Sequence, residues 1–193
     1  MHKRKLDSIL VVDVESTCWE GPPPTGEDNE IIEIGLCLLD VATGERKDRD
    51  SILVRPERSR VSEYCTKLTT LTQAQVDQGI SFAGACNLLK EKYGSDQRLW
   101  ASYGDYDRQM FDRQCHERGV PYPFGKGHLN VKSLFAITCG LPHEMGLSRA
   151  LKYLGLELEG AHHRGGDDAW NVAAILSKIL LAARAGLPAK PER

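Results

Sequence analysis

The stretch VVDVESTCWEG, residues 11–21, places two carboxylates inside a hydrophobic run that is typical of a buried β-strand. Side chains on a strand alternate between its two faces, so Asp13 and Glu15 share one face while Val12 and Val14 share the other. Two like charges about 7 Å apart along a strand repel each other and resist burial. A cation bound between them would remove that cost, and we therefore expect a cation site on this face.

The composition is that of an ordinary globular protein. The chain has 193 residues, of which 41% are hydrophobic and 27% charged, and this size suffices for one domain with its own core. We expect a single domain over residues 1–193, with a core at about 8–182 and a short C-terminal tail at 186–193. The formal net charge of −2 excludes the broad basic surface of a non-specific nucleic-acid coat, but it permits a local cationic or metal-bridged site.

The first residues are basic and then apolar, but Asp7 interrupts the run and Asp13 follows soon after it. Neither a signal peptide nor a membrane span fits this pattern, so we expect a cytoplasmic protein without a membrane partner. The six cysteines are scattered and form no CxxC pair, which argues against a zinc ribbon and against a disulfide framework. We expect most of them to be buried thiols.

The hydrophobic periodicity predicts an α/β protein that begins with three sequential strands, at 8–14, 30–40 and 48–54. Helical spacing over residues 72–94 is broken at Gly79 and Gly94, and a fourth strand is predicted at 98–104. The helices predicted after it lie at 106–118, 131–139 and 146–154, followed by a long amphipathic helix from Asp167 to about Ala185.

Two further carboxylates stand at the ends of predicted elements. Asp107 lies just beyond the fourth strand, at the start of a helix, and Asp168 lies in the first turn of the last helix. Connections at strand ends often carry functional groups, whereas the helix dipole alone can favour an acid in a first turn. Each position taken alone is as well explained by a capping or solvated acid, but the four acids together favour a site.

Three motifs resemble those of the DnaQ-like DEDDh exonuclease family. The family order of Asp-x-Glu, Asp, and His-x4-Asp is matched here by Asp13 and Glu15, by Asp107, and by His163 with Asp168. The resemblance runs over roughly residues 8–182. The segments ESTCWEG, LTTLTQAQVDQG and YGDYDRQMFDRQC are most similar to the branch that contains the eukaryotic enhanced-RNAi/histone-mRNA 3′ exonucleases and their bacterial relatives.

The resemblance implies an RNase H-like fold, with a central mixed five-stranded sheet flanked by helices, and 3′-to-5′ hydrolysis of phosphodiester bonds that releases nucleoside monophosphates. It implies two Mg²⁺ (or Mn²⁺) ions held by Asp13, Glu15, Asp107 and Asp168, with His163 as the general base. The chemistry agrees, because these ions prefer carboxylate oxygens. A histidine, with an ordinary pKa of about 6.5, can take a proton from water at neutral pH.

Neighbouring residues offer alternatives for two of these roles. His162 with Asp167 keeps the same spacing as His163 with Asp168. We prefer the later pair because DDAWNVAAIL, residues 167–176, matches the family best when its second Asp faces the site. We also prefer Asp107 to Asp105, which we expect to cap the helix that follows it.

Residues just after the catalytic strand are where family members receive the terminal nucleotide. The resemblance therefore implies substrate binding by Ser16, Thr17, Cys18 and Trp19. Trp19 and Tyr106 are candidates for stacking on a base, which contributes about 1–3 kcal/mol. Packing against the core edge or a helix is the alternative interpretation of the two aromatic residues.

The expected partner is a single-stranded 3′ end, with RNA preferred to DNA. Two other functions stay open: a catalytically silent nucleic-acid-binding or regulatory module on the same fold, and a DNA proofreading exonuclease. The complete set of four acids and a histidine favours the enzyme.

Overall fold

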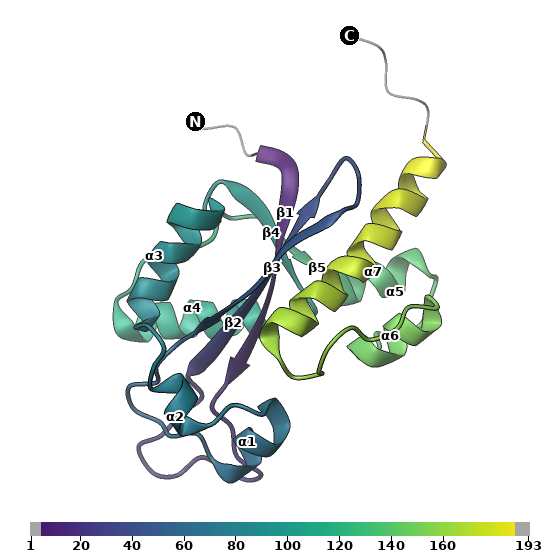
Figure 1. The fold of residues 1–193 in the computed structure, drawn as a ribbon. Helices are drawn as coiled ribbons and strands as arrows, with labels where there is room; N and C mark the ends of the chain where they lie inside the picture. The colour runs from purple at the N-terminus through teal and green to yellow at the C-terminus, as the bar shows by residue number, and fades with distance from the viewer. Residues whose placement is uncertain (1–4, 188–193) are drawn as a thin grey trace.

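Five strands form one mixed sheet in the order β3-β2-β1-β4-β5 (Figure 1), in a computed structural model that describes residues 5–187. Most of the predicted tail at 186–193 therefore lies outside the described residues. β1, β2 and β3 form an antiparallel meander, and β4 and β5 add parallel to β1. The prediction of a mixed five-stranded sheet is confirmed. The strands are β1 (Lys5–Ser16), β2 (Ile31–Asp40), β3 (Arg46–Leu53), β4 (Arg98–Ser102) and β5 (His128–Asn130).

Helices cover both faces of the sheet, with α3 and α4 on one side and α5, α6 and α7 on the other (Figure 1). The alternation along β1 explains the two cores, because Leu10 and Val12 pack with α3 and α4 while Ile9 and Val11 pack with α7. The helices are α1 (Glu63–Thr69), α2 (Gln73–Val76), α3 (Phe82–Tyr93), α4 (Tyr106–Arg118), α5 (Val131–Thr138), α6 (Leu147–Tyr153) and α7 (Gly165–Ala185).

The predicted elements agree with the observed ones, apart from two short elements that were not predicted. The helix predicted at 106–118 is α4, whereas the strand predicted at 98–104 ends at Ser102. The two elements without a prediction are α1, of 7 residues, and β5, of 3. Both are too short to show a hydrophobic period, so their existence depends on tertiary contacts.

Asp105 does not cap α4 as predicted. It stands at the N-cap position, but its side chain accepts no hydrogen bond from the helix backbone. Its carboxylate instead accepts hydrogen bonds from Arg108 at 3.2 Å and from Asn130 at 3.1 Å. The carboxylate of Asp105 is thus bound by Arg108 and by Asn130 of β5 instead of by the backbone amides of α4.

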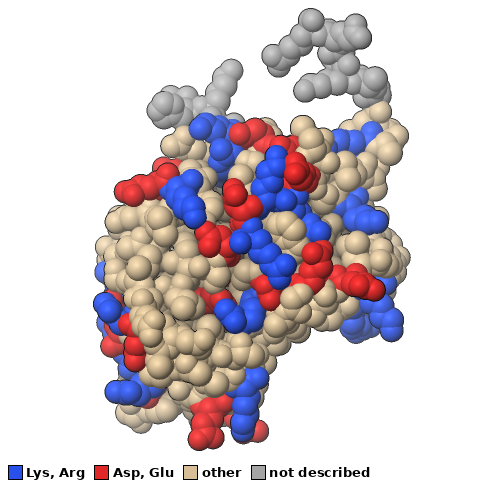
Figure 2. Space-filling model, in the orientation of Figure 1, with Lys and Arg blue, Asp and Glu red and all other residues tan. Residues whose placement is uncertain are grey.

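The surface and the cysteines agree with the composition. Figure 2 shows acidic and basic side chains intermixed over the face that it displays. The cysteines are free thiols, and Cys37, Cys65, Cys86 and Cys115 are buried. Within residues 5–187, no helix has both the length and the apolar character needed to cross a bilayer.

Two glycines allow the start of α7 to touch the sheet. Gly35 lies opposite Asp13 in the register of β1 and β2, and a Cβ atom at Gly35 would overlap the backbone of Gly165 and Gly166. A Cβ at Gly165 would in turn lie 2.8 Å from the amide nitrogen of Gly35. Only a pair of residues without side chains lets α7 begin this close to β2.

We predict that Gly35→Ala destabilises the protein, because one added methyl group must push α7 away from the sheet. Overpacking of this kind costs typically about 1–3 kcal/mol, and thermal unfolding followed by circular dichroism measures the loss. Gly21→Ala is the matched control, since no atom lies within 4 Å of a Cβ at Gly21. Equal melting temperatures for the two variants would contradict the prediction.

Candidate active site

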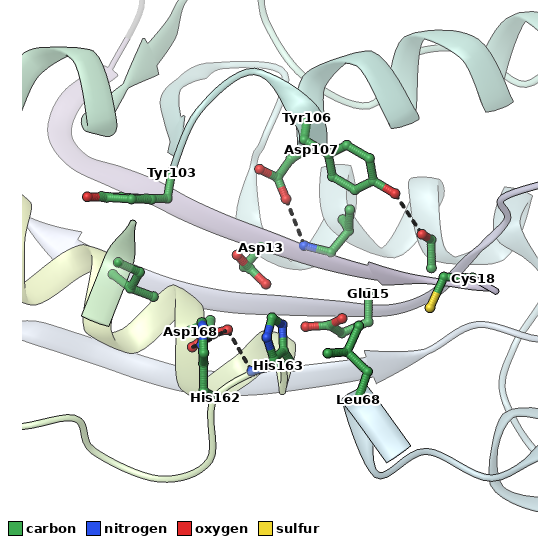
Figure 3. A pocket seen from close by; sticks show the side chains of 13 residues that line it. Asp13, Glu15, Cys18, Leu68, Tyr103, Tyr106, Asp107, His162, His163 and Asp168 are labelled. Carbon is green, nitrogen blue, oxygen red and sulfur yellow. Dashed lines mark hydrogen bonds and ion pairs between the residues drawn. The ribbon is translucent and has the colours of Figure 1, made fainter. Parts of the chain in front are cut away.

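A cavity of about 360 Å³ opens at the carboxyl end of β1 (Figure 3). Its walls come from segments far apart in the sequence: the end of β1, the start of α4, and the turn before α7. The lining residues are Asp13, Val14, Glu15, Ser16, Cys18, Leu68, Tyr103, Tyr106, Asp107, Leu147, His162, His163 and Asp168.

Three of the four predicted metal ligands meet in this cavity. Asp13, Glu15 and Asp168 each offer a carboxylate oxygen, and these oxygens lie within 4.8 Å of one another. Asp13 is half-buried, while Glu15 and Asp168 are only 8% and 3% exposed. The strand therefore directs Asp13 and Glu15 to one face, as the sequence predicts, and α7 adds the third acid.

Asp107 lines the same cavity but stands apart from that cluster. Its Oδ1 accepts a hydrogen bond of 2.9 Å from the backbone amide of Val14, and its side chain is buried. This bond fixes the start of α4 against β1, between the two acids of the strand. In Figure 3 the side chain of Asp13 lies between Asp107 and Asp168.

Burial and mutual repulsion disfavour ionisation of Asp13, Glu15 and Asp107. Burial raises the pKa of Glu15 to about 8, and the charges of Asp168, Glu33 and Asp107 act in the same direction. Burial and then the charge of Asp107 raise the pKa of Asp13 well above its ordinary value. Burial also raises the pKa of Asp107 to about 6, against the lowering effect of the Val14 amide. Protons or cations would relieve this repulsion, and the hard oxygen donors of the cluster fit a divalent cation.

The structure distinguishes Asp168 from its neighbour. The carboxylate of Asp167 forms an ion pair with Arg49 and accepts a hydrogen bond of 2.7 Å from the amide of Ala161, on the outside of the turn. Asp168 instead faces the cavity, where its Oδ2 accepts a hydrogen bond of 2.9 Å from the amide of His163. The pairing of His163 with Asp168 is thus the one whose acid reaches the other carboxylates.

Both adjacent histidines line the cavity, and their rings stack with centroids 4.0 Å apart. Nδ1 of His162 lies 3.0 Å from Oδ2 of Asp168, so that nitrogen is engaged by a predicted ligand. Within the described residues the ring of His163 has no hydrogen-bond partner, and burial lowers its pKa below the ordinary 6.5. His163 adopts a left-handed backbone with φ of 61°, which is uncommon for a residue with a side chain.

Of the five predicted substrate-binding residues, Ser16, Cys18 and Tyr106 line the cavity. The hydroxyl groups of Ser16 and Tyr106 hydrogen-bond to each other at 2.8 Å. Thr17 lies outside the cavity lining: its side chain is fully buried and its hydroxyl hydrogen-bonds to the backbone of Asp28 and Glu30, so its substrate-binding role stays a prediction. Trp19 is half-exposed but outside the cavity lining, so its stacking role stays a prediction.

Sequence reasoning missed several lining residues. Leu68, Tyr103 and Leu147 form apolar and aromatic parts of the wall, and the Tyr103 hydroxyl donates to the carbonyl oxygen of Met145 at 2.9 Å. These residues come from separate helices and loops. Nothing in their local pattern distinguishes them from ordinary core residues, because only the folded chain brings them to one place.

Comparisons with known proteins agree with this geometry. A family model described as Exonuclease matches residues 10–176. The 3′-5′ exoribonuclease 1 of Homo sapiens is 33% identical over 184 residues, which are 90% of this chain and 52% of the human protein. The chain thus spans about half the length of the mammalian relatives that it matches.

Two solved structures are similar over most of the described fold. One is titled as the nuclease domain of 3′hExo, a DEDDh family member, bound to rAMP. It is 32% identical with a TM-score of 0.81, and the match covers 91% of this chain and 92% of that domain. The other is titled as 3′-end recognition of histone mRNA stem-loop by 3′-exonuclease, and it is 30% identical with a TM-score of 0.81, covering 94% of this chain and 66% of that one. The chain therefore belongs to the exonuclease family, as a DEDDh member with an RNase H-like fold.

Proposed function

We propose that the chain is a metal-dependent 3′-to-5′ exonuclease that hydrolyses phosphodiester bonds at single-stranded 3′ ends, prefers RNA to DNA, and releases nucleoside monophosphates. The gathering of Asp13, Glu15 and Asp168 in one cavity beside His163 carries the proposal. The human relative is named an exoribonuclease, and the similar nuclease domain is titled as bound to rAMP. Both names support activity on RNA.

Four carboxylates would hold two divalent cations, Mg²⁺ or Mn²⁺. Asp13, Glu15 and Asp168 would hold them through oxygens that lie within 4.8 Å of one another, and Asp107 lines the same cavity. When bound, such ions stabilise charge on the phosphoryl group that is transferred and activate the attacking water. The protein's own contribution is to hold the carboxylates together in one cavity.

His163 is the group that would accept the proton from the attacking water. Its lowered pKa keeps the imidazole neutral at neutral pH, as a base requires. Its ring nitrogens are not engaged by other described side chains, whereas Nδ1 of His162 is held by Asp168. His162 then supports the turn by stacking on His163 and binding the adjacent acid.

The rim beside Glu15 would meet the terminal sugar. The paired hydroxyl groups of Ser16 and Tyr106 lie at the cavity wall and can each donate and accept hydrogen bonds. A 2′-hydroxyl, which also donates and accepts, is the group by which a protein distinguishes RNA from DNA. A partner recognised at its end also suits a surface with intermixed charges (Figure 2).

The other two functions differ from this proposal in measurable ways. A silent binding module would bind nucleic acid without cleaving it, and a proofreading enzyme would favour DNA ends. Protein partners are not implied by any feature of the cavity. A cytoplasmic location stays a proposal from the sequence.

We predict faster trimming of a 5′-labelled single-stranded RNA than of the matching DNA in the presence of Mg²⁺. Blunt duplex ends should resist, because the terminal nucleotide must leave its stack at a cost of a few kcal/mol. Asp13→Asn is the inactive control, since it removes one carboxylate of the cluster that would hold the ions. Equal kcat/KM on RNA and DNA would remove the RNA preference, and binding without cleavage would favour the silent module.

A second prediction separates the two histidines. His163→Ala should lower kcat by about 10²–10⁴, the usual contribution of one acid–base group, because the attacking water loses its proton acceptor. His162→Ala should lower kcat much less, and it serves as the matched control in single-turnover assays on RNA. If His162→Ala is the more damaged variant, the roles of the two histidines are reversed.

A third prediction concerns stability without metal. An acid whose pKa is higher in the folded protein than in the unfolded chain binds protons more tightly when folded, so stability falls as pH rises between the two values. For Glu15 these values are 4.5 and about 8. In EDTA, the melting temperature should therefore fall from pH 5 to pH 8, by an amount that reflects about 1.4 kcal/mol for each pKa unit at most.

The same measurement has two internal controls. Asp13→Asn should flatten the pH dependence and raise stability at pH 8, because one of the repelling charges is gone. Mg²⁺ should stabilise the wild-type protein more at pH 8 than at pH 5, since protons compete with the ion for the carboxylates. A melting temperature that stays constant or rises over this pH range in EDTA would show that the pKa values of these acids are not raised in the folded protein.

A further inference from the structure

Glu33 is a buried acid that belongs to none of the motifs. It lies in β2 within the run IIEIG at 31–35, directly opposite Glu15 in the register with β1. Its side chain is 1% exposed. A lone carboxylate among isoleucines, on a strand that is otherwise buried and apolar at this point, needs partners to remain there.

Both oxygens of Glu33 are fully used by hydrogen-bond donors. Oε1 accepts from the hydroxyl of Ser51 and from Nη2 of Arg164 at 3.0 Å. Oε2 accepts from Nε of Arg164 at 3.3 Å and from the amide of Gly165 at 2.8 Å. Two of the three partner residues are consecutive and form the N-terminus of α7, where the helix dipole also favours a negative charge.

These bonds hold the turn that carries the catalytic groups. Arg164 directly follows His163, and Asp168 lies in the first turn of the same helix. The amide of His163 binds the carboxylate of Asp168, so the two residues move with the N-terminus of α7. The contact of Gly35 with Gly165, two positions along β2 from Glu33, fixes how closely the helix approaches.

The position of Glu33 has an electrostatic cost. Its charge adds to the repulsion that raises the pKa values of Asp13 and Glu15. A residue that only filled the core would avoid this cost with an apolar side chain. We propose that Glu33 is a positioning residue, whose two oxygens fix the start of α7 so that His163 and Asp168 face Asp13 and Glu15; its effect on catalysis rests on the proposed exonuclease activity.

A glutamine cannot replace this carboxylate. An amide offers one acceptor oxygen, and its NH₂ group would face either the Ser51 and Arg164 donors or the Gly165 amide. Glu33→Gln therefore loses one set of acceptors and leaves Arg164 without a full counter-charge. The shape of the side chain is retained, so the core packing around β2 should be unaffected.

Glu30 provides a matched control. It is also a buried glutamate, 2% exposed, and it pairs with Arg118 and accepts hydrogen bonds from the amides of residues 57–59. Its side chain contacts no residue that lines the cavity among the described hydrogen bonds and ion pairs. Glu30→Gln should thus cost stability in the same way without disturbing α7.

The decisive experiment combines hydrogen exchange with kinetics. In metal-free protein, followed by mass spectrometry, Glu33→Gln should speed amide exchange in residues 163–168, whereas Glu30→Gln should speed it only near residues 57–59. With Mg²⁺ and single-stranded RNA, Glu33→Gln should lower kcat by about 10- to 100-fold, the usual effect of losing a partner that orients metal ligands. KM should change little, since Ser16 and Tyr106, the residues proposed to meet the terminal sugar, do not lie on α7.

The outcomes separate this inference from the proposed function. Wild-type exchange in residues 163–168 of the Glu33→Gln variant, or an equal loss of kcat in Glu30→Gln, would overturn the positioning role. If the wild-type protein cleaves no nucleic acid, the exonuclease proposal fails, and the exchange data still test the role of Glu33. Should Glu33→Gln fail to fold, Arg164→Lys keeps the charge but cannot bridge both oxygens; it should speed exchange in the same segment, and wild-type exchange there would overturn the proposal.

Discussion

The close approach of α7 to β2 is the constraint on which the site depends. Gly35 faces Gly165 without a side chain between them, and Gly35 is also the residue opposite Asp13 on the neighbouring strand. Because α7 starts at this point, an acid in its first turn reaches the carboxylates of β1. This contact brings Asp13 and Asp168, which are far apart in the sequence, into one site. A single methyl group at Gly35 would overlap the start of α7 and move the two acids apart.

The cluster of buried acids in the cavity disfavours the folded state. Acidic side chains gather in one cavity, and the pKa values of Asp13, Glu15 and Asp107 are raised because burial and mutual repulsion disfavour ionisation. The scaffold must hold them with bonds that do not depend on a cation. The Val14 amide holds Asp107, and Glu33 holds the start of α7. A cation bound here would offset the repulsion among the carboxylates and so stabilise the folded protein. Metal affinity and stability would therefore be linked.

The sequence was sufficient for those features that depend on local periodicity. The alternation along β1 placed Asp13 and Glu15 on one face, and the long helix near the C-terminus was recognised from its apolar stripe. The sequence could not separate Asp167 from Asp168 by spacing alone. The ion pair that holds Asp167 outside the cavity is formed with Arg49 of β3, which is distant in the sequence. Nor could the sequence show that the hydroxyl of Thr17 hydrogen-bonds to the loop before β2, because no local pattern fixes the path of that loop.

Glu33, like Asp13, is a charged residue within a hydrophobic strand sequence, but this sequence pattern alone did not assign a role to Glu33. A buried carboxylate can serve a ligand or a backbone, and only its partners distinguish the two. At Asp13 the neighbours are other acids, and their charges together with burial raise its pKa, so a cation or a proton would stabilise the group. At Glu33 the neighbours are a guanidinium, a hydroxyl and a helix amide, so the charge is already satisfied. Two acids on neighbouring strands thus have opposite requirements, because Glu33 is satisfied by donors from α7 and β3 whereas Asp13 faces other carboxylates.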